Sequence, residues 1–186
     1  LMSGMTLLLI IWVLVKVPDY PGQSSSQRMA LREVFLTPGV RPVLGVVFTW
    51  MLAHNILYTY VAPFVSNAGL ASDVDLVLLA FGVAALAGIW VTGRLVDRHL
   101  RKTVLASLAT FAAVSVFLGL FSGSALAIYI GVFVWGLTFG GAATLLQTAL
   151  ADSAGKGADV ALSMNVVVWN SAIAGGGLLG GVWLGQ

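Results

Sequence analysis

Residues 103–151 restrict most strongly how this chain can fold, because they contain no Lys, Arg, Asp or Glu. As a single helix they would extend about 73 Å, more than twice the roughly 30 Å hydrocarbon core of a bilayer. We therefore expect this stretch to fold back on itself, with a turn at residues 122–124, Ser-Gly-Ser. Further uncharged runs lie at residues 42–72, 76–93 and 160–186.

These runs predict a membrane protein made of helices. Hydrophobic residues make up 59% of the chain and charged residues only 9%, and the mean hydropathy is +1.00. In lipid, backbone polar groups must be paired within a helix or a closed barrel, and continuous apolar runs favour helices. We predict an all-α membrane helical bundle with one partial and five complete transmembrane helices. The complete spans are expected near residues 42–65, 74–96, 103–121, 125–151 and 160–184.

Residues 1–17 are expected to be the end of a preceding span, the sixth. The uncharged run at residues 1–15 would form a helix of only about 22 Å, which is short for a complete span. A signal peptide is the alternative interpretation, but it requires a basic region before the apolar stretch and a small-residue cleavage site after it. Here Lys16 follows the run.

Residues 18–41 form a polar connection that begins with several serines. Met29, Leu31, Val34 and Phe35 then recur with partly helical spacing. We interpret this segment as a cytoplasmic linker that ends in a short surface helix.

Positive charges alternate between successive connections. Residues 16–41 carry four Lys or Arg side chains, the next connection none, residues 93–102 four, the turn at 122–124 none, and residues 152–159 one. Because cytoplasmic loops are enriched in Lys and Arg, we predict that residues 16–41, 94–102 and 152–159 face the cytoplasm. The basic residues are therefore interpreted as topology signals, and we expect no nucleic-acid partner.

His54 is the ionisable side chain expected inside a span. It lies midway along residues 42–65, close to the bilayer midplane, with Asn55 beside it and Tyr58 one turn further on the same face. An ionisable group in lipid normally faces a cavity or a partner. Two interpretations remain open: His54 bonds to a neighbouring helix for packing, or it contacts substrate or carries protons.

Two asparagines lie in the last expected span. Asn165 and Asn170 are separated by about 140° around a helix, so they cannot share a face. Asn170 lies nearer the midpoint of the span, and this depth favours a position in the cavity. Trp169 and Asn165, four residues apart, form an alternative stripe.

Glycines recur four residues apart on two of the expected helices. This spacing allows helix backbones to approach closely, so we interpret these glycines as packing residues. They are Gly136 with Gly140, Gly176 with Gly180, and Gly177 with Gly181. The chain has no cysteine and no HExxH, GxSxG or Walker sequence, so we expect no metal and no cofactor.

Residues 93–102, Gly-x-x-x-Asp-Arg-x-x-Arg-Lys, resemble the signature loop of major facilitator superfamily transporters. Residues 54–64 and 165–181 look like the seventh and eleventh spans of bacterial twelve-span drug and sugar efflux proteins, the arabinose-efflux-permease-like group. The resemblance covers essentially the whole chain. Leu100 and Ala172 depart from it, because the family usually has glycine at the first position and often at the second.

This resemblance implies the C-terminal half of a transporter, at residues 42–186. Such a protein has two six-helix halves built from inverted three-helix repeats, which rock around a midplane site driven by the proton gradient. It also implies a gating loop, in which Asp97 meets the start of the following helix and the cations meet partner carboxylates or lipid headgroups. The gating residues are Gly93, Asp97, Arg98, Arg101 and Lys102. The same cations also serve topology.

The sequence thus predicts a proton-coupled antiporter of the bacterial inner membrane that exports a small organic compound such as a drug or a sugar, and not an enzyme. Its expected partners are the substrate, protons, membrane lipid and the N-terminal half of the same polypeptide. The expected substrate contacts are His54, Asn55, Tyr58, Trp169 and Asn170. A membrane-embedded enzyme with His54 as base or ligand, and a non-transporting scaffold or sensor, are the alternatives.

Overall fold

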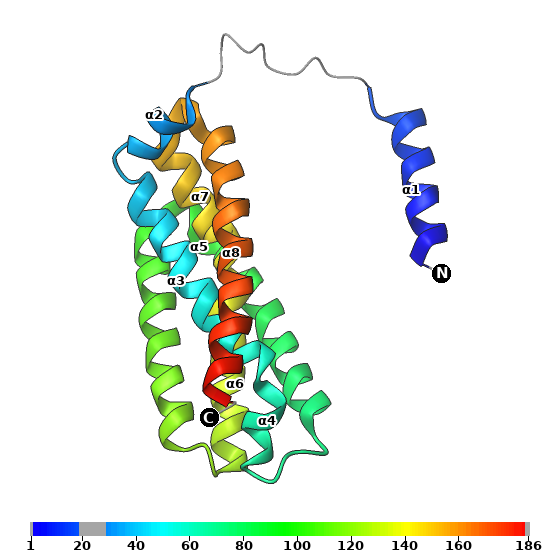
Figure 1. The fold of residues 1–186 in the computed structure, drawn as a ribbon, viewed down its shortest axis with the longest axis vertical. Helices are drawn as coiled ribbons and strands as arrows, with labels where there is room; N and C mark the ends of the chain where they lie inside the picture. The colour runs from blue at the N-terminus through cyan, green and yellow to red at the C-terminus, as the bar shows by residue number, and fades with distance from the viewer. Residues whose placement is uncertain (1, 19–28, 185–186) are drawn as a thin grey trace.

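The computed structural model describes residues 2–18 and 29–184, which are helical apart from short connections and contain no strand. The first helix, α1 (Met2–Lys16), lies apart from the others in Figure 1. The others form one bundle. They are α2 (Leu31–Leu36), α3 (Val40–Thr59), α4 (Val61–Ser66), α5 (Val74–Leu120), α6 (Ala125–Gly140), α7 (Ala142–Ala154), the 3₁₀ turn η2 (Gly155–Gly157) and α8 (Ala158–Leu184).

The charged segment at residues 93–102, which we expected to be a loop, is part of α5. This 47-residue helix leaves helical geometry only at His99, where φ is −139° and ψ is 29°. Figure 1 shows α5 approaching the end of the bundle where α2 lies and then running back from it. The reversal uses a negative φ that any residue can adopt, so it does not require a glycine at Leu100.

Two of the expected spans are each divided into two helices. The span expected at residues 42–65 is interrupted at Tyr60, between α3 and α4. Pro63 explains this break, because it has no N–H to bond to the carbonyl group of Thr59 and its ring crowds that carbonyl. The span expected at residues 125–151 is interrupted at Gly141, between α6 and α7.

By length and hydropathy, three stretches of the described residues could cross a membrane: Val40–Thr59, Val74–Leu120 and Ala125–Val182. The second reverses at His99 and the third at η2. The first stretch therefore runs along the bundle once, and the second and third each run along it twice. Together they account for five passes along the bundle.

The helix backbones of α5 and α6 touch at glycines. No other pair of helices in the described bundle packs as extensively as these two. A Cβ added to Gly136 would overlap the carbonyl group of Phe81, and one added to Gly140 would overlap that of Ala85. Glycine is therefore required for this close approach.

α8 packs along α3 in a similar way. A Cβ on Gly176 would lie 2.9 Å from the Cβ of Asn55, and one on Gly180 would overlap the ring of Tyr60. At Gly181 a Cβ would lie 3.0 Å from the hydroxyl of Tyr60, whereas Gly177 has nothing within 4 Å of that position. The Tyr60 hydroxyl instead donates a hydrogen bond of 2.7 Å to the Gly177 carbonyl.

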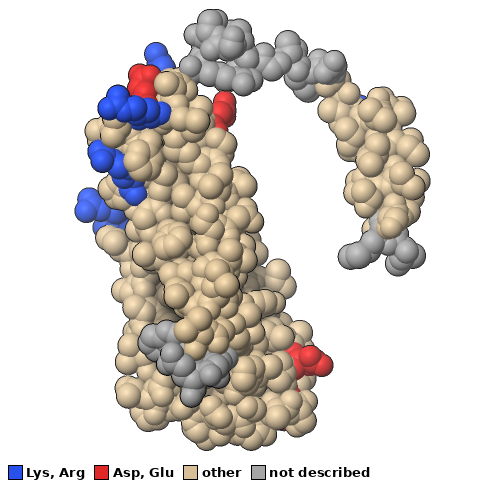
Figure 2. Space-filling model, in the orientation of Figure 1, with Lys and Arg blue, Asp and Glu red and all other residues tan. Residues whose placement is uncertain are grey.

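Lys and Arg side chains gather at one end of the bundle, as Figure 2 shows. We call it the basic end: it contains α2, the start of α3, the bend of α5 at His99, and η2. Asp73 and Asp75, at the start of α5, lie at the opposite end. This separation follows the charge alternation seen in the sequence.

Adding one methyl group to Gly140 tests the contact between α5 and α6. We expect Gly140→Ala to lower the free energy of unfolding by about 1–3 kcal/mol, because the new Cβ meets a main-chain carbonyl group. Gly82→Ala, where a Cβ in α5 has nothing within 4 Å, is the matched control and should be neutral or slightly stabilising. Thermal unfolding of the purified protein in detergent measures both, and equal midpoints would contradict the close contact.

Candidate functional site

A buried hydrogen bond joins the middle of α3 to α6. The indole N–H of Trp135 donates to Nδ1 of His54 over 3.1 Å. His54 is only 7% exposed, and Trp135 is fully buried. Each polar atom thus satisfies the other where water does not reach.

Aromatic rings surround this hydrogen bond. The ring of Phe139 is stacked on His54, with centroids 3.4 Å apart and planes 4° from parallel. Tyr58 stacks at 5.6 Å, and Phe81 of α5 lies 6.0 Å away. We call these three residues, together with His54 and Trp135, the aromatic cluster. Tyr58 is its open member, with 46% of its surface exposed.

The direction of this hydrogen bond determines the protonation of His54. Because an indole N–H can only donate, Nδ1 must accept, and the proton of a neutral imidazole lies on Nε2. A protonated ring would present a donor to a donor. The faces around His54 in α3, α5 and α6 carry aromatic rings, and Tyr58 is the titratable group among them. This arrangement favours the packing interpretation of His54 over the proton-carrying one.

The other expected contact residues lie on different faces. The amide of Asn55 donates to the Met51 carbonyl at 2.8 Å, and its Cβ faces Gly176 of α8. Asn170 is exposed and donates to the carbonyl of Val166 in its own helix at 2.8 Å. Trp169 is half-buried against the core. The structure therefore brings His54 and Tyr58 together, but places Asn55 and Asn170 elsewhere.

Asn165, and not Asn170, is the asparagine of α8 that is buried within this bundle. It is 3% exposed, and its side-chain oxygen has no hydrogen-bond partner. Depth along the helix had favoured Asn170, but depth says nothing about the direction of a side chain. Asn170 remains available to groups outside the described bundle.

Phe81, Trp135 and Phe139 were not among the residues expected at the site. Trp135 and Phe139 are four residues apart, so they share a face of α6. That spacing is visible in the sequence. However, an aromatic pair on an apolar helix can equally face lipid, and only the packing of α6 on α3 identifies it.

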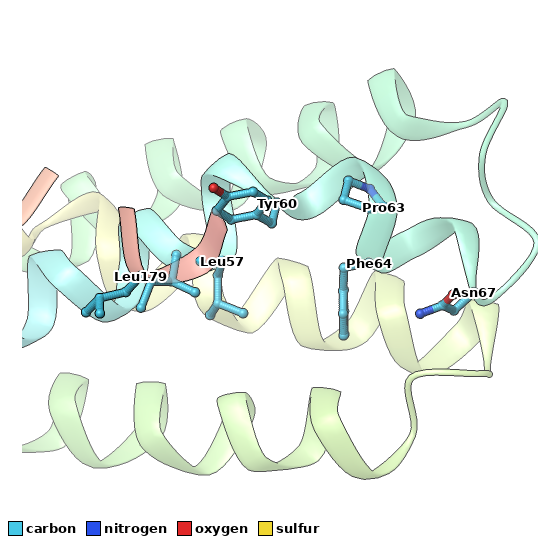
Figure 3. A pocket seen from close by; sticks show the side chains of 8 residues that line it. Leu57, Tyr60, Pro63, Phe64, Asn67 and Leu179 are labelled. Carbon is cyan, nitrogen blue, oxygen red and sulfur yellow. The ribbon is translucent and has the colours of Figure 1, made fainter. Parts of the chain in front are cut away.

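An apolar pocket of about 490 Å³ lies between α3, α4 and α8 (Figure 3). It is lined by Ile56, Leu57, Tyr60, Pro63, Phe64, Asn67, Leu179 and Gly180. Its size suits a small molecule, but such sites also need polar groups that fix the ligand's orientation. The Tyr60 hydroxyl is already bonded to Gly177, which leaves Asn67 as the uncommitted polar side chain of the lining. The aromatic cluster is therefore a better candidate for a functional site than this pocket.

The expected gating residues are exposed on α5, on both sides of the bend. Gly93, Asp97, Arg98, Arg101 and Lys102 are all exposed. Nearby, the guanidinium of Arg94 lies 3.9 Å over the ring of Trp90. No group of three or more possible metal ligands occurs among the described residues.

Comparison with known proteins identifies the family. The model of the Major Facilitator Superfamily matches residues 1–177. The chain is 32% identical to the purine ribonucleoside efflux pump NepI of Shigella sonnei (strain Ss046), over 95% of the chain and 45% of that protein. The NepI of Escherichia coli (strain K12) matches at the same identity and coverage, and that of Escherichia coli O1:K1 / APEC is 31% identical over 96% of the chain and 46% of that protein.

The chain thus spans just under half the length of these relatives. No solved structure matches it closely.

Replacing both partners of the buried hydrogen bond should lower the free energy of unfolding by less than the sum of the two single replacements. We expect His54→Leu to lower the free energy of unfolding by about 1–3 kcal/mol, because it leaves the buried indole N–H of Trp135 unpaired. Adding Trp135→Phe removes that donor and should recover part of the loss. Thermal unfolding of the two single variants and the double variant measures the coupling.

Trp50→Phe is the matched control, since the indole N–H of Trp50 is buried without a partner. Combined with His54→Leu, it should recover none of the free energy of unfolding that His54→Leu loses, because it removes no partner of His54. If the effects of His54→Leu and Trp135→Phe on the free energy of unfolding are strictly additive, the hydrogen bond contributes nothing.

Proposed function

This chain belongs to the major facilitator superfamily, and we propose that it forms the C-terminal half of a proton-coupled exporter of a small organic compound. The observation that carries the proposal is the family match over residues 1–177, together with efflux pumps that resemble nearly the whole chain. Its family, its bacterial relatives and its apolar helices indicate an integral protein of the bacterial inner membrane, a transporter rather than an enzyme.

The proposed substrate is a planar heteroaromatic compound, with purine ribonucleosides as the first candidates. The relatives are named as purine ribonucleoside efflux pumps. The sequence had suggested a drug or a sugar, and a nucleoside combines a flat base with a sugar. Tyr58 supports the choice, because its ring is half exposed and planar bases stack on aromatic side chains.

Within this site each residue has a different proposed role. Tyr58 offers a surface for stacking, while His54 and Trp135 hold that part of α3 against α6. Asn170 is a proposed contact because its side chain is exposed in this half of the protein. Asn55 and Trp169 are proposed to act indirectly, through the packing of α3 and α8.

The basic end is proposed to face the cytoplasm, as the charge distribution supports. Asp97, Arg98, Arg101 and Lys102 are then free to meet the other half of the protein or lipid headgroups, because all four are exposed. Contacts of this kind can form in one access state and break in the other. Gly93 is proposed to contribute to this gate by leaving the surface of α5 clear.

Export of inosine, a purine ribonucleoside, tests this function in the intact protein. Cells that produce the protein should lose preloaded radiolabelled inosine faster than control cells, and a protonophore should abolish the difference. Inosine loss that is unchanged by the protein would contradict the proposed substrate. Loss that persists with the protonophore would contradict proton coupling.

Tyr58 variants then test the site. Tyr58→Ala should raise the KM for inosine about tenfold, since stacking on an aromatic side chain is worth about 1–3 kcal/mol per base. Tyr58→Phe keeps the ring and is the matched control, so its KM should stay close to that of the unaltered protein. If the two variants have the same KM, Tyr58 does not stack on the substrate.

A further inference from the structure

The last part of the linker, residues 29–39, packs on the turn between α7 and α8. Its short helix, α2, contacts α3 and α8. Val34 is completely buried there, in a cluster with Leu150 and Ala154 of α7 and Ala161 of α8. We call residues 29–39 the docked segment.

Gly157 provides the space into which Val34 fits. A Cβ on Gly157 would lie 2.7 Å from Cγ2 of Val34 and 3.4 Å from the sulfur of Met29. A larger residue at position 157 would therefore push the docked segment away unless Val34 is made smaller at the same time. The fit is specific to these positions, because the neighbouring Gly155 has nothing within 4 Å of its Cβ position.

Two further contacts hold the segment at its other end. The guanidinium of Arg41, in the first turn of α3, lies 5.9 Å from the ring centroid of Phe35. Gly39 has a φ of 95°, and a Cβ there would lie 2.9 Å from the hydroxyl oxygen of Ser153 in α7. The Ser153 hydroxyl is fixed by its hydrogen bond of 2.7 Å to the Ala149 carbonyl.

The core beneath the docked segment is formed by three helices of the bundle. Val34 shares its cluster with Val40 and Leu44 of α3 as well as with α7 and α8. A six-residue helix is not stable alone in water, so α2 depends on these contacts for its structure. Undocking would expose a buried apolar side chain and unfold the helix.

We infer that the docked segment stays attached to the turn between α7 and α8 throughout the transport cycle, an inference that rests on the proposed function. Movements of the rest of the protein are then transmitted to the bundle through α7 and α8 as well as through the start of α3. Val34 and Gly157 are positioning residues in this account.

A disulfide between Val34→Cys and Gly157→Cys tests the inference in the intact protein. This chain has no cysteine of its own, and the γ-carbons of Val34 lie 2.7 and 3.2 Å from the Cβ position of Gly157, close enough for a disulfide. The pair should crosslink on oxidation. The oxidised protein should still export inosine at a rate within about twofold of the reduced protein, because nothing needs to separate.

Val34→Cys with Gly155→Cys is the matched control. The Cβ position of Gly155 has nothing within 4 Å, so this pair should not crosslink. Failure of the pair at Val34 and Gly157 to crosslink would overturn the docking itself. Crosslinking that stops export, with recovery on reduction, would show that the segment must undock during the cycle.

Failure of the proposed function gives a different result, because the reduced pair and the unaltered protein would then both fail to export inosine. In that case, trypsin cleavage after Arg32 decides the inference without any transport. The docked helix should be cut slowly, and Val34→Asp should speed this cut about tenfold, whereas Leu36→Asp, at an exposed position, should not. Equal cutting of the two variants would overturn the inference.

Discussion

The contact of helix backbones at glycine is the interaction on which the rest of this structure depends. Lipid provides no hydrophobic drive between helices, so their association relies on close packing. Gly136 and Gly140 let α6 rest on the carbonyl groups of α5. This depth of approach brings Trp135 and Phe139 to the level of His54 in α3. The aromatic cluster is thus a consequence of small residues that take no part in it.

The same contacts divide the polar residues of the bundle into fixed and available groups. His54 and Trp135 satisfy each other and are closed to water, whereas Tyr58 and Asn170 remain exposed. The proposed transporter half needs both kinds, because a rigid wall must present groups that a substrate can reach in either access state. At the basic end, Val34 in the space over Gly157 similarly joins the linker to that wall.

Much of the fold could be predicted from the sequence, because apolar run lengths and loop charges depend on the bilayer alone. The reversal at His99 within a continuous helix could not, since it depends on how the two arms of α5 pack. Likewise the sequence predicted His54 inside an apolar helix, but its hydrogen-bond partner lies 81 residues away. Asn165 and Asn170 show the same limit, because their spacing separates their faces without indicating which one is buried.

The central claim is that the exposed side of the aromatic cluster faces the substrate path. Labelling of Tyr58→Cys in the intact protein, with any cysteine outside this chain first replaced, tests it most directly, since this chain has no cysteine. A membrane-impermeant thiol reagent should label this position from water, and saturating inosine should slow the labelling. A position that no aqueous reagent reaches, or whose labelling inosine leaves unchanged, would contradict the claim.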